Sequence, residues 1–249
     1  MAKVHNEELA TAAGTSGSRP MKSKKSHASR AVHSASSSSS SKLRVGRENV
    51  LVPEYQRAAA GTTKSIWLTF DDGPHSKHTE TVLKTLERYK IRATFFVLGE
   101  NAKRQVRLVR TAFQAGHRIG NHSFSHRDMS RLSEGEIRNE FKRTEDVIGA
   151  YLGREKLFRP PYGAHNAAVD RVAVELGYRT ILWNVDTLDW NPRYQPDRWV
   201  QHGIDQIRVR DSCRILAHDI HQSTAENVEL LVQRIRALGK VTFKPPSTL

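Results

Sequence analysis

Short apolar segments that alternate with amphipathic segments constrain the fold of this chain more than any other feature of its sequence. Residues 66–70 and 93–97 are mostly apolar at consecutive positions, as is typical of strands buried on both faces of a sheet. After the first segment, Val82, Leu86 and Tyr89 recur at helical spacing. Strand and helix alternate in this way about seven times, without strand pairs joined by tight turns. We therefore expect an α/β fold built on parallel strands.

The remaining elements are predicted from the same patterns and from helix-end signals. Capping-box spacing at Ser133 and Glu136, and again at Ser223 and Glu226, predicts two helix starts. Gly116 is placed to end an earlier helix. We expect one continuous helix over 101–115 and further strands at 117–120, 158–159, 180–185, 214–217 and 241–243. A distorted barrel and an open doubly wound sheet both fit this order, and both place functional residues at the carboxyl ends of strands.

Residues 1–60 differ in composition from the rest of the chain. They contain the serine run Ser36–Ser41, further Ser, Ala and Lys residues, and very few large apolar ones. Because such a segment cannot bury enough apolar surface to offset its ordering entropy, we predict a disordered, Ser/Lys-rich basic tail over 1–60. We expect one folded domain over 61–249, which is long enough to bury a sizeable core.

The net charge of +14 bears on the class of partner. Residues 1–60 hold ten Lys and Arg against four Asp and Glu, so the tail contributes +6 and the remainder +8. A basic surface attracts anionic wall polymers, anionic membranes or nucleic acid. No nucleic-acid-binding motif is present, so we predict no specific nucleic-acid partner. No apolar stretch is long enough to span a bilayer, so we predict no transmembrane segment.

Two clusters of acidic and histidine residues follow predicted strands. Asp71 and Asp72 end the first strand and precede a Gly-Pro dipeptide, and on their own they are typical of an ordinary turn. His122 and His126 stand four positions apart, which would place both rings on one side of a helical turn, close enough to share a metal. One Asp and two His residues would supply three ligands and leave open positions for water and substrate.

Three further clusters supply groups for acid–base chemistry and binding. The prolines of 159–163 hold an extended backbone that directs the side chains of Arg159 and Tyr162. The other two clusters, 186–190 and 216–219, end later strands. In isolation each of the three is more typical of an ordinary loop. In combination with the first two clusters, a second Asp, an Arg and a further His provide acid–base machinery beside a metal site.

The five clusters, taken in order, resemble the motifs of the polysaccharide deacetylase family, also called carbohydrate esterase family 4 or the NodB-type fold. The resemblance covers residues 64–243. It implies a distorted (β/α)7-type barrel with parallel strands and makes 61–249 the expected catalytic domain. It also implies that Asp72, His122 and His126 bind one divalent metal, with zinc favoured and cobalt, nickel or manganese as alternatives.

The resemblance implies catalytic and substrate-binding roles for the other residues of the clusters. Asp71 would be the base, with Arg159 as its charged partner. His218 would be the general acid, with Asp189 behind it. The backbone N–H of Tyr162 would stabilise the oxyanion. The residues expected to contact the substrate are Tyr162, Trp190 and Leu216.

The expected activity is hydrolysis of a linear amide C–N bond, which removes N-acetyl groups from a GlcNAc-containing polysaccharide and releases acetate. Residues 216–221 and the helix after them look more like the peptidoglycan deacetylases than other branches of the family, although a chitin-like polymer also fits. O-deacetylation of acetylxylan or a similar ester uses the same groups and is the alternative. A non-catalytic carbohydrate-binding relative is a third hypothesis. We expect a monomer that acts on the polysaccharide.

The location of the chain is not settled by these patterns. Such polysaccharides lie in the periplasm, in the cell wall or outside the cell. However, no apolar segment typical of a signal peptide follows the basic residues after Met21, so a cytoplasmic location stays open.

Several residues near the clusters have no expected role. We expect Trp183 to pack in the core or at the rim of the fold, with a role in a sugar-stacking platform as the alternative. The remaining histidines of this region are expected to be surface or loop residues: His75, His78, His117, His165 and His221.

Overall fold

The computed structural model describes residues 50–51 and 61–249, so all but two residues of the predicted tail lie outside the described part of the chain. Every strand pair in the described part is parallel, and the strand order is β1-β6-β5-β4-β3-β2-β8-β7, with β9 beside β2. The strands are β1 (Val50–Leu51), β2 (Lys64–Asp71), β3 (Thr94–Val97), β4 (Arg118–Asn121), β5 (Lys156–Phe158), β6 (Tyr178–Ile181), β7 (Val185–Asp186), β8 (Ser212–His218) and β9 (Val241–Phe243).

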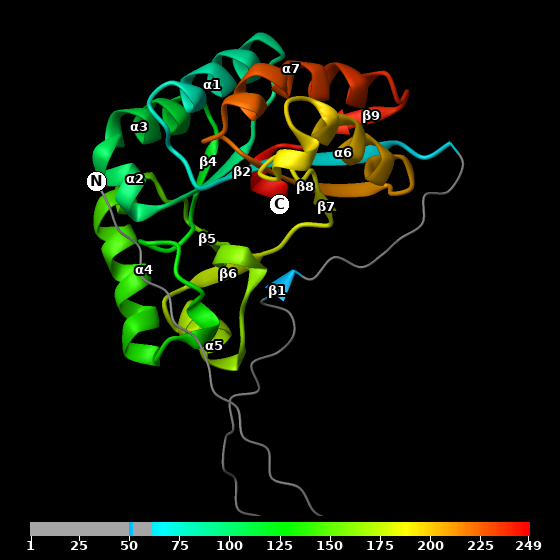
Figure 1. The fold of residues 1–249 in the computed structure, drawn as a ribbon. Coiled ribbons are helices and arrows are strands. Elements are labelled where there is room, and N and C mark those ends of the chain that lie inside the picture. The colour runs from blue at the N-terminus through cyan, green and yellow to red at the C-terminus, as the bar shows by residue number, and fades with distance from the viewer. Residues whose placement is uncertain (1–49, 52–60) are drawn as a thin grey trace, which may run out of the picture. The chain divides into compact units, whose positions relative to one another are not determined.

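Helices lie outside the curled sheet, as Figure 1 shows. They are α1 (His78–Arg88), α2 (Gly99–Arg104), α3 (Val106–Gln114), α4 (Glu134–Ile148), α5 (Ala167–Glu175), α6 (Arg198–Arg208) and α7 (Gln222–Arg236). Short 3-10 helices cover 129–131, 149–151, 161–163, 192–194 and 246–248. This arrangement confirms the predicted distorted barrel with parallel strands. No helix of the described residues combines the length and apolar character that crossing a bilayer requires.

The central strand β2 positions much of the candidate site. Ile66, Leu68 and Phe70 point to one face of this strand and are at most 2% exposed. Thr69 on the other face is 0% exposed, in accord with the prediction of a strand buried on both faces. One edge of β2 pairs with β8 from Ser65 to Asp71, and the register sets Asp71 opposite His218. The other edge is shared: β9 pairs with residues 64–66, and β3 pairs with residues 69–71. The carboxyl ends of β2, β3 and β8 therefore meet at one end of the barrel.

Two predicted elements are each divided in the structure. The helix expected over 101–115 is two helices, interrupted at Gln105, whose φ of −131° and ψ of 38° are not helical. The two helices face different neighbours, since α2 packs mainly on α4 and α3 packs on β4. The strand expected over 180–185 is also two strands, because β6 pairs with β5 whereas β7 pairs with β8. Periodicity along the chain does not record a change of neighbour.

The two predicted capping boxes have different outcomes. At Ser133 the side chain accepts from the Glu136 N–H while the Glu136 carboxylate accepts from the Ser133 N–H, which confirms the first box. The second prediction is wrong. Helix α7 begins at Gln222, with His221 in the N-cap position and no side-chain cap. Ser223 lies inside the helix, and its hydroxyl is buried without a hydrogen-bond partner.

Candidate active site

A buried ion pair stands at the carboxyl end of β2. Asp71 is 2% exposed, and its Oδ1 accepts a hydrogen bond of 2.8 Å from Arg159 Nη1. The guanidinium of Arg159, which is fully buried, also donates to Thr69 Oγ1 and to the carbonyl of Ile181, at 2.7 and 3.0 Å. Its carbon lies 4.2 Å from the centre of the Phe96 ring. The Asp71 carboxylate is therefore held in one orientation by a cation that is itself fixed on several sides.

Asp72, His122 and His126 converge beside this ion pair. The Nε2 atoms of both histidines lie 3.3 Å from Asp72 Oδ1, and one potential ligand atom from each residue lies within 4.8 Å of the others. Asp72 Oδ1 is buried, yet no hydrogen bond of normal geometry satisfies it. Two imidazole nitrogens and a carboxylate oxygen are a donor set that zinc takes readily. The site thus fits the divalent metal that the family resemblance implies.

The backbone that brings the two histidines together is not the expected helical turn. His122 follows β4 directly, and Ser123 and His126 have φ values of 69° and 60°. The carboxylate of Glu140 on α4 secures this loop by accepting from the N–H groups of Phe124 and Ser125, at 2.8 and 2.9 Å. The prediction that both rings approach each other agrees with the structure, but the helical reason given for it was wrong.

The other ring nitrogen of each histidine is bound to the segment 159–163. His122 Nδ1 lies 2.7 Å from the carbonyl oxygen of Arg159, and His126 Nδ1 lies 3.1 Å from the hydroxyl of Tyr162. A carbonyl only accepts, so His122 Nδ1 carries a proton and its Nε2 keeps a lone pair in the neutral ring. Such contacts fix the tautomer and orientation of histidines that bind a metal.

Burial and charge oppose each other at these residues. Burial alone would raise the pKa of Asp72, but the close contact and charge of His122 hold it below its ordinary value. Burial would lower the pKa of His122, and the carboxylates of Asp71 and Asp72 raise it. For His126, burial prevails and the pKa is lowered. Asp72 is therefore ionised, as a metal ligand must be.

His218 and Asp189 form a second buried pair on the other side of Asp71. His218 Nδ1 lies 2.8 Å from Asp189 Oδ1, while Asp189 Oδ2 accepts from the backbone N–H of His218 and from the hydroxyl of Thr224, at 2.7 and 2.6 Å. Burial would lower the pKa of His218, but the charge of Asp189 raises it to about 9. With Nδ1 occupied by Asp189, Nε2 is the nitrogen left to exchange a proton.

These groups surround a cavity of about 480 Å³ at the carboxyl ends of the strands. Arg159 and Asp189 do not line it but lie behind Asp71 and His218. Tyr162 and Trp190 are exposed at 68% and 48%. The lining residues are Asp71, Asp72, His122, His126, Tyr162, Trp183, Asp186, Trp190, Leu216, His218 and His221.

The comparisons with known proteins agree with this geometry. Residues 58–181 match the family described as polysaccharide deacetylase. The peptidoglycan-N-acetylglucosamine deacetylase PgdA of Listeria monocytogenes is 37% identical over 196 residues, which are 77% of this chain and 40% of the relative. The solved structure of the peptidoglycan deacetylase PdaC from Bacillus subtilis is 33% identical, with a TM-score of 0.66 over 75% of this chain and 89% of that chain.

The chain belongs to the polysaccharide deacetylase family. It spans less than half the length of the Listeria relative. The family fold also occurs without activity: a carbohydrate esterase family 4 pseudoenzyme from Bacillus anthracis is 28% identical, with a TM-score of 0.65 over 74% of this chain and 65% of that chain. Family membership alone therefore does not establish catalysis, which depends on the residues in the cavity.

Some residues of this deacetylase-family site were missed by the sequence reasoning. Trp183 and His221 line the cavity, although packing and a surface position were expected for them. Thr224 donates to Asp189 from inside α7. Asp219 is 1% exposed, accepts from the hydroxyl of Thr79, and has its pKa raised by burial to about 7. Asp219 belongs to the cluster 216–219, whereas the only sequence signal for the other three residues was their proximity to the five clusters.

The other histidines without an expected role differ in burial. His75 is exposed, and His78 and His165 are partly buried, broadly as expected for surface or loop residues. His117 lies in the loop before β4 but is only 5% exposed, which corrects any expectation of a surface position.

Proposed function

We propose that this chain is a metal-dependent hydrolase that removes N-acetyl groups from a GlcNAc-containing polysaccharide of the cell wall and releases acetate. The observation that carries the proposal is the convergence of Asp72, His122 and His126. On one side of them is the Asp71 carboxylate, which is paired with a cation, and on the other is the His218 imidazole, which is paired with a carboxylate. We assign the activity to residues 61–249, which contain all of these groups. The peptidoglycan deacetylases among the relatives favour peptidoglycan over a chitin-like polymer.

The metal site provides the first part of the mechanism. Asp72, His122 and His126 would hold the ion, for which two nitrogen ligands and one oxygen ligand favour zinc over harder cations. A bound divalent ion would lower the pKa of water and polarise the acetyl carbonyl. The contacts of His122 and His126 with the segment 159–163 keep their Nε2 atoms directed at Asp72.

Asp71 is the base in this proposal. Its Oδ1 is bound by Arg159, which leaves Oδ2 toward the histidines, 3.8 Å from His122 Nε2. Because Arg159 is buried and held by Thr69 and Ile181, its charge stays beside the carboxylate throughout a reaction cycle. We propose that Asp71 takes the proton of the attacking water.

His218 is the acid in this proposal. An amine cannot leave as an anion, so a proton must reach the amide nitrogen as the C–N bond breaks. The Asp189 carboxylate holds the imidazolium form of His218, and Nε2 is the nitrogen free to donate. We assign the oxyanion contact to the backbone N–H of Tyr162, and the contact with the acetyl methyl group to Trp190 and Leu216, which line the same cavity.

A non-catalytic carbohydrate-binding protein is the second candidate, because a pseudoenzyme shares the fold. Binding alone would not require a base with its own cation and an acid with its own carboxylate. The paired arrangement of Asp71 with Arg159 and of His218 with Asp189 therefore favours catalysis.

Acetate release tests the proposal. Zinc-loaded protein is incubated with peptidoglycan, chitin oligomers and acetylxylan, before and after chelation and with zinc restored. We expect most release from peptidoglycan, loss with chelator, and recovery with zinc. Asp72→Asn should remove zinc binding and activity, whereas Asp205→Asn on the surface of α6 should change neither. Glycan binding without acetate release would refute the proposal, and faster release from acetylxylan would favour the O-acetyl esterase alternative.

A further inference from the structure

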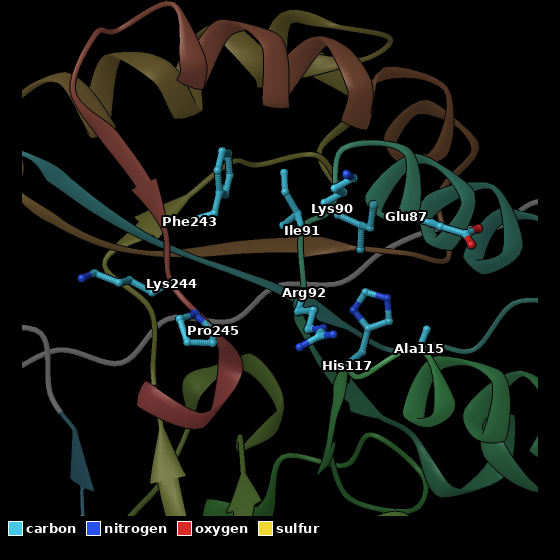
Figure 2. A pocket seen from close by; sticks show the side chains of 10 residues that line it. Glu87, Lys90, Ile91, Arg92, Ala115, His117, Phe243, Lys244 and Pro245 are labelled. Atoms are coloured by element: carbon cyan, nitrogen blue, oxygen red, sulfur yellow. The ribbon is translucent and has the colours of Figure 1, made fainter.

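A groove lies near the opposite end of the strands from the catalytic cavity. Strand β2 is longer than β3, so β9 pairs with the first residues of β2 on the same edge that β3 uses further along. The groove forms where β9 meets the loops that enter β3 and β4, and Figure 2 shows its lining side chains. Two adjoining cavities of about 510 and 450 Å³ share Arg92, His117 and Pro245.

Cations without a carboxylate partner line this groove. Lys90, Arg92 and Lys244 border the first cavity, and Arg154 borders the second. None of the four forms an ion pair within the described residues. Glu155 in the second cavity is already bound by Arg118 and Arg179. Glu87 in the first cavity is a carboxylate that no described cation pairs with. The cations outnumber it, so the groove keeps an excess of positive charge.

The buried side chain of His117 adds a hydrogen-bond donor to these charges. It is 5% exposed and borders both cavities. Its Nδ1 accepts from the backbone N–H of Ala93 at 3.0 Å, so in the neutral ring the proton is on Nε2. No acceptor for this N–H is present among residues 61–249. Because His117 borders both cavities, this N–H is available to a ligand or to water in the groove.

Arg92 occupies space next to His117 that a glycine leaves open. Gly116 has a φ of 83°, and a Cβ at this position would lie 2.7 Å from Arg92 Nε. The missing side chain thus leaves room for the guanidinium to lie over the glycine. Figure 2 shows Arg92 and His117 side by side, with the apolar residues Ile91, Phe243 and Pro245 around them.

We propose that this groove binds a phosphate group through Arg92, His117 Nε2 and the flanking Lys90 and Lys244. Three cations and a neutral N–H offer more donors and charge than a carboxylate uses, whereas a phosphate presents three strong acceptor oxygens and up to two charges. The phosphate is free or belongs to a phosphodiester polymer. This site is separate from the deacetylase reaction and does not depend on the function proposed above.

Isotope-labelled, zinc-loaded full-length protein tests the proposal by NMR titration with inorganic phosphate at constant ionic strength. The signals to follow are the Gly116 amide and the His117 side-chain N–H. These signals report on the groove, because Gly116 and His117 precede β4. Phosphate bound at the metal would instead shift the signals of His122 and His126, which follow β4. We expect saturable shifts at Gly116 and His117. A poly(glycerol phosphate) chain that binds more tightly per phosphate would identify a polymer as the source, and equal affinity would identify a small phosphate.

Matched variants separate a built site from general charge. Arg92→Gln and Lys244→Gln should each weaken phosphate binding, Arg92→Gln by about tenfold or more. Arg110→Gln removes one exposed cation from α3, outside both cavities, and should change the affinity less than about twofold. Absence of saturable shifts in the wild-type protein, or equal losses for Arg92→Gln and Arg110→Gln, would overturn the proposal.

Discussion

Replacing Asp189 by Asn should make the loss of deacetylase activity depend on pH. In the structure the Asp189 carboxylate raises the pKa of His218 to about 9, against an ordinary value near 6.5. At pH 8 about 90% of His218 is then protonated in the wild type, and about 3% if the pKa returns to 6.5. An acid must be protonated to donate, so amide cleavage should fall about thirtyfold at pH 8 but less than twofold at pH 6. Any loss of ring orientation adds a factor that does not vary with pH.

The measurement is acetate release from the preferred substrate between pH 6 and 9, expressed as the ratio of wild type to Asp189→Asn. A bound dication lowers the pKa of His218 in both proteins, so the ratio keeps its upward trend with pH. Asp205→Asn removes an exposed carboxylate, whose side chain is 58% accessible, and should give a ratio near one throughout. A large ratio that is constant with pH would refute the reasoning, because Asp189 would then only orient the ring.

Three further predictions test separate parts of the structure. Tyr162→Phe removes the hydroxyl 3.1 Å from His126 Nδ1 and should weaken zinc binding about 10–100-fold in a chelator competition assay. Tyr194→Phe removes a hydroxyl that does not contact His126 and should leave zinc binding unchanged. His218→Ala should reduce amide cleavage by about 100-fold or more and cleavage of an aryl acetate far less, because that leaving group hardly needs a proton; equal losses would contradict an acid role. Ser223→Ala removes a buried hydroxyl without a partner and should raise the free energy of unfolding, measured by urea denaturation, by up to about 1 kcal/mol. Thr224→Val removes a hydrogen bond to Asp189 and should lower the same free energy by about 1–3 kcal/mol.

Sequence reasoning located the strands and the motif residues because both depend on local signals. Apolar runs mark buried strands, and polar residues that follow them must lie at the carboxyl ends of a parallel sheet. This is how Asp71, Asp72 and His218 can be placed near one another from the sequence alone. The family resemblance then supplied the barrel and the roles, which periodicity had left open.

The errors arose where the neighbour of a segment decides its conformation. The break at Gln105 and the division of 178–186 into two strands follow from packing partners that are remote in sequence. His122 and His126 approach through a loop with positive φ values, which Glu140 secures from another helix. A spacing of four residues is compatible with both a helical turn and this loop, so the spacing could not distinguish them.

The site combines two buried ion pairs whose members come from different strands and loops. Arg159 reaches Asp71 from the segment after β5, and Asp189 reaches His218 from the segment after β7. The direct pairing of β2 with β8 then sets Asp71 opposite His218, so that the proposed base and acid flank the same proposed metal ligands. A buried charge without its partner is strongly destabilising. Each pair therefore contributes to the stability of the fold as well as to the proposed reaction. A relative that loses one member would therefore have to change the other or lose stability. Loss of the partly exposed His126, whose side chain is 27% accessible, would cost the fold less. We infer that His126, the most exposed of the three proposed metal ligands, is a position at which a member of this fold can lose activity while remaining folded.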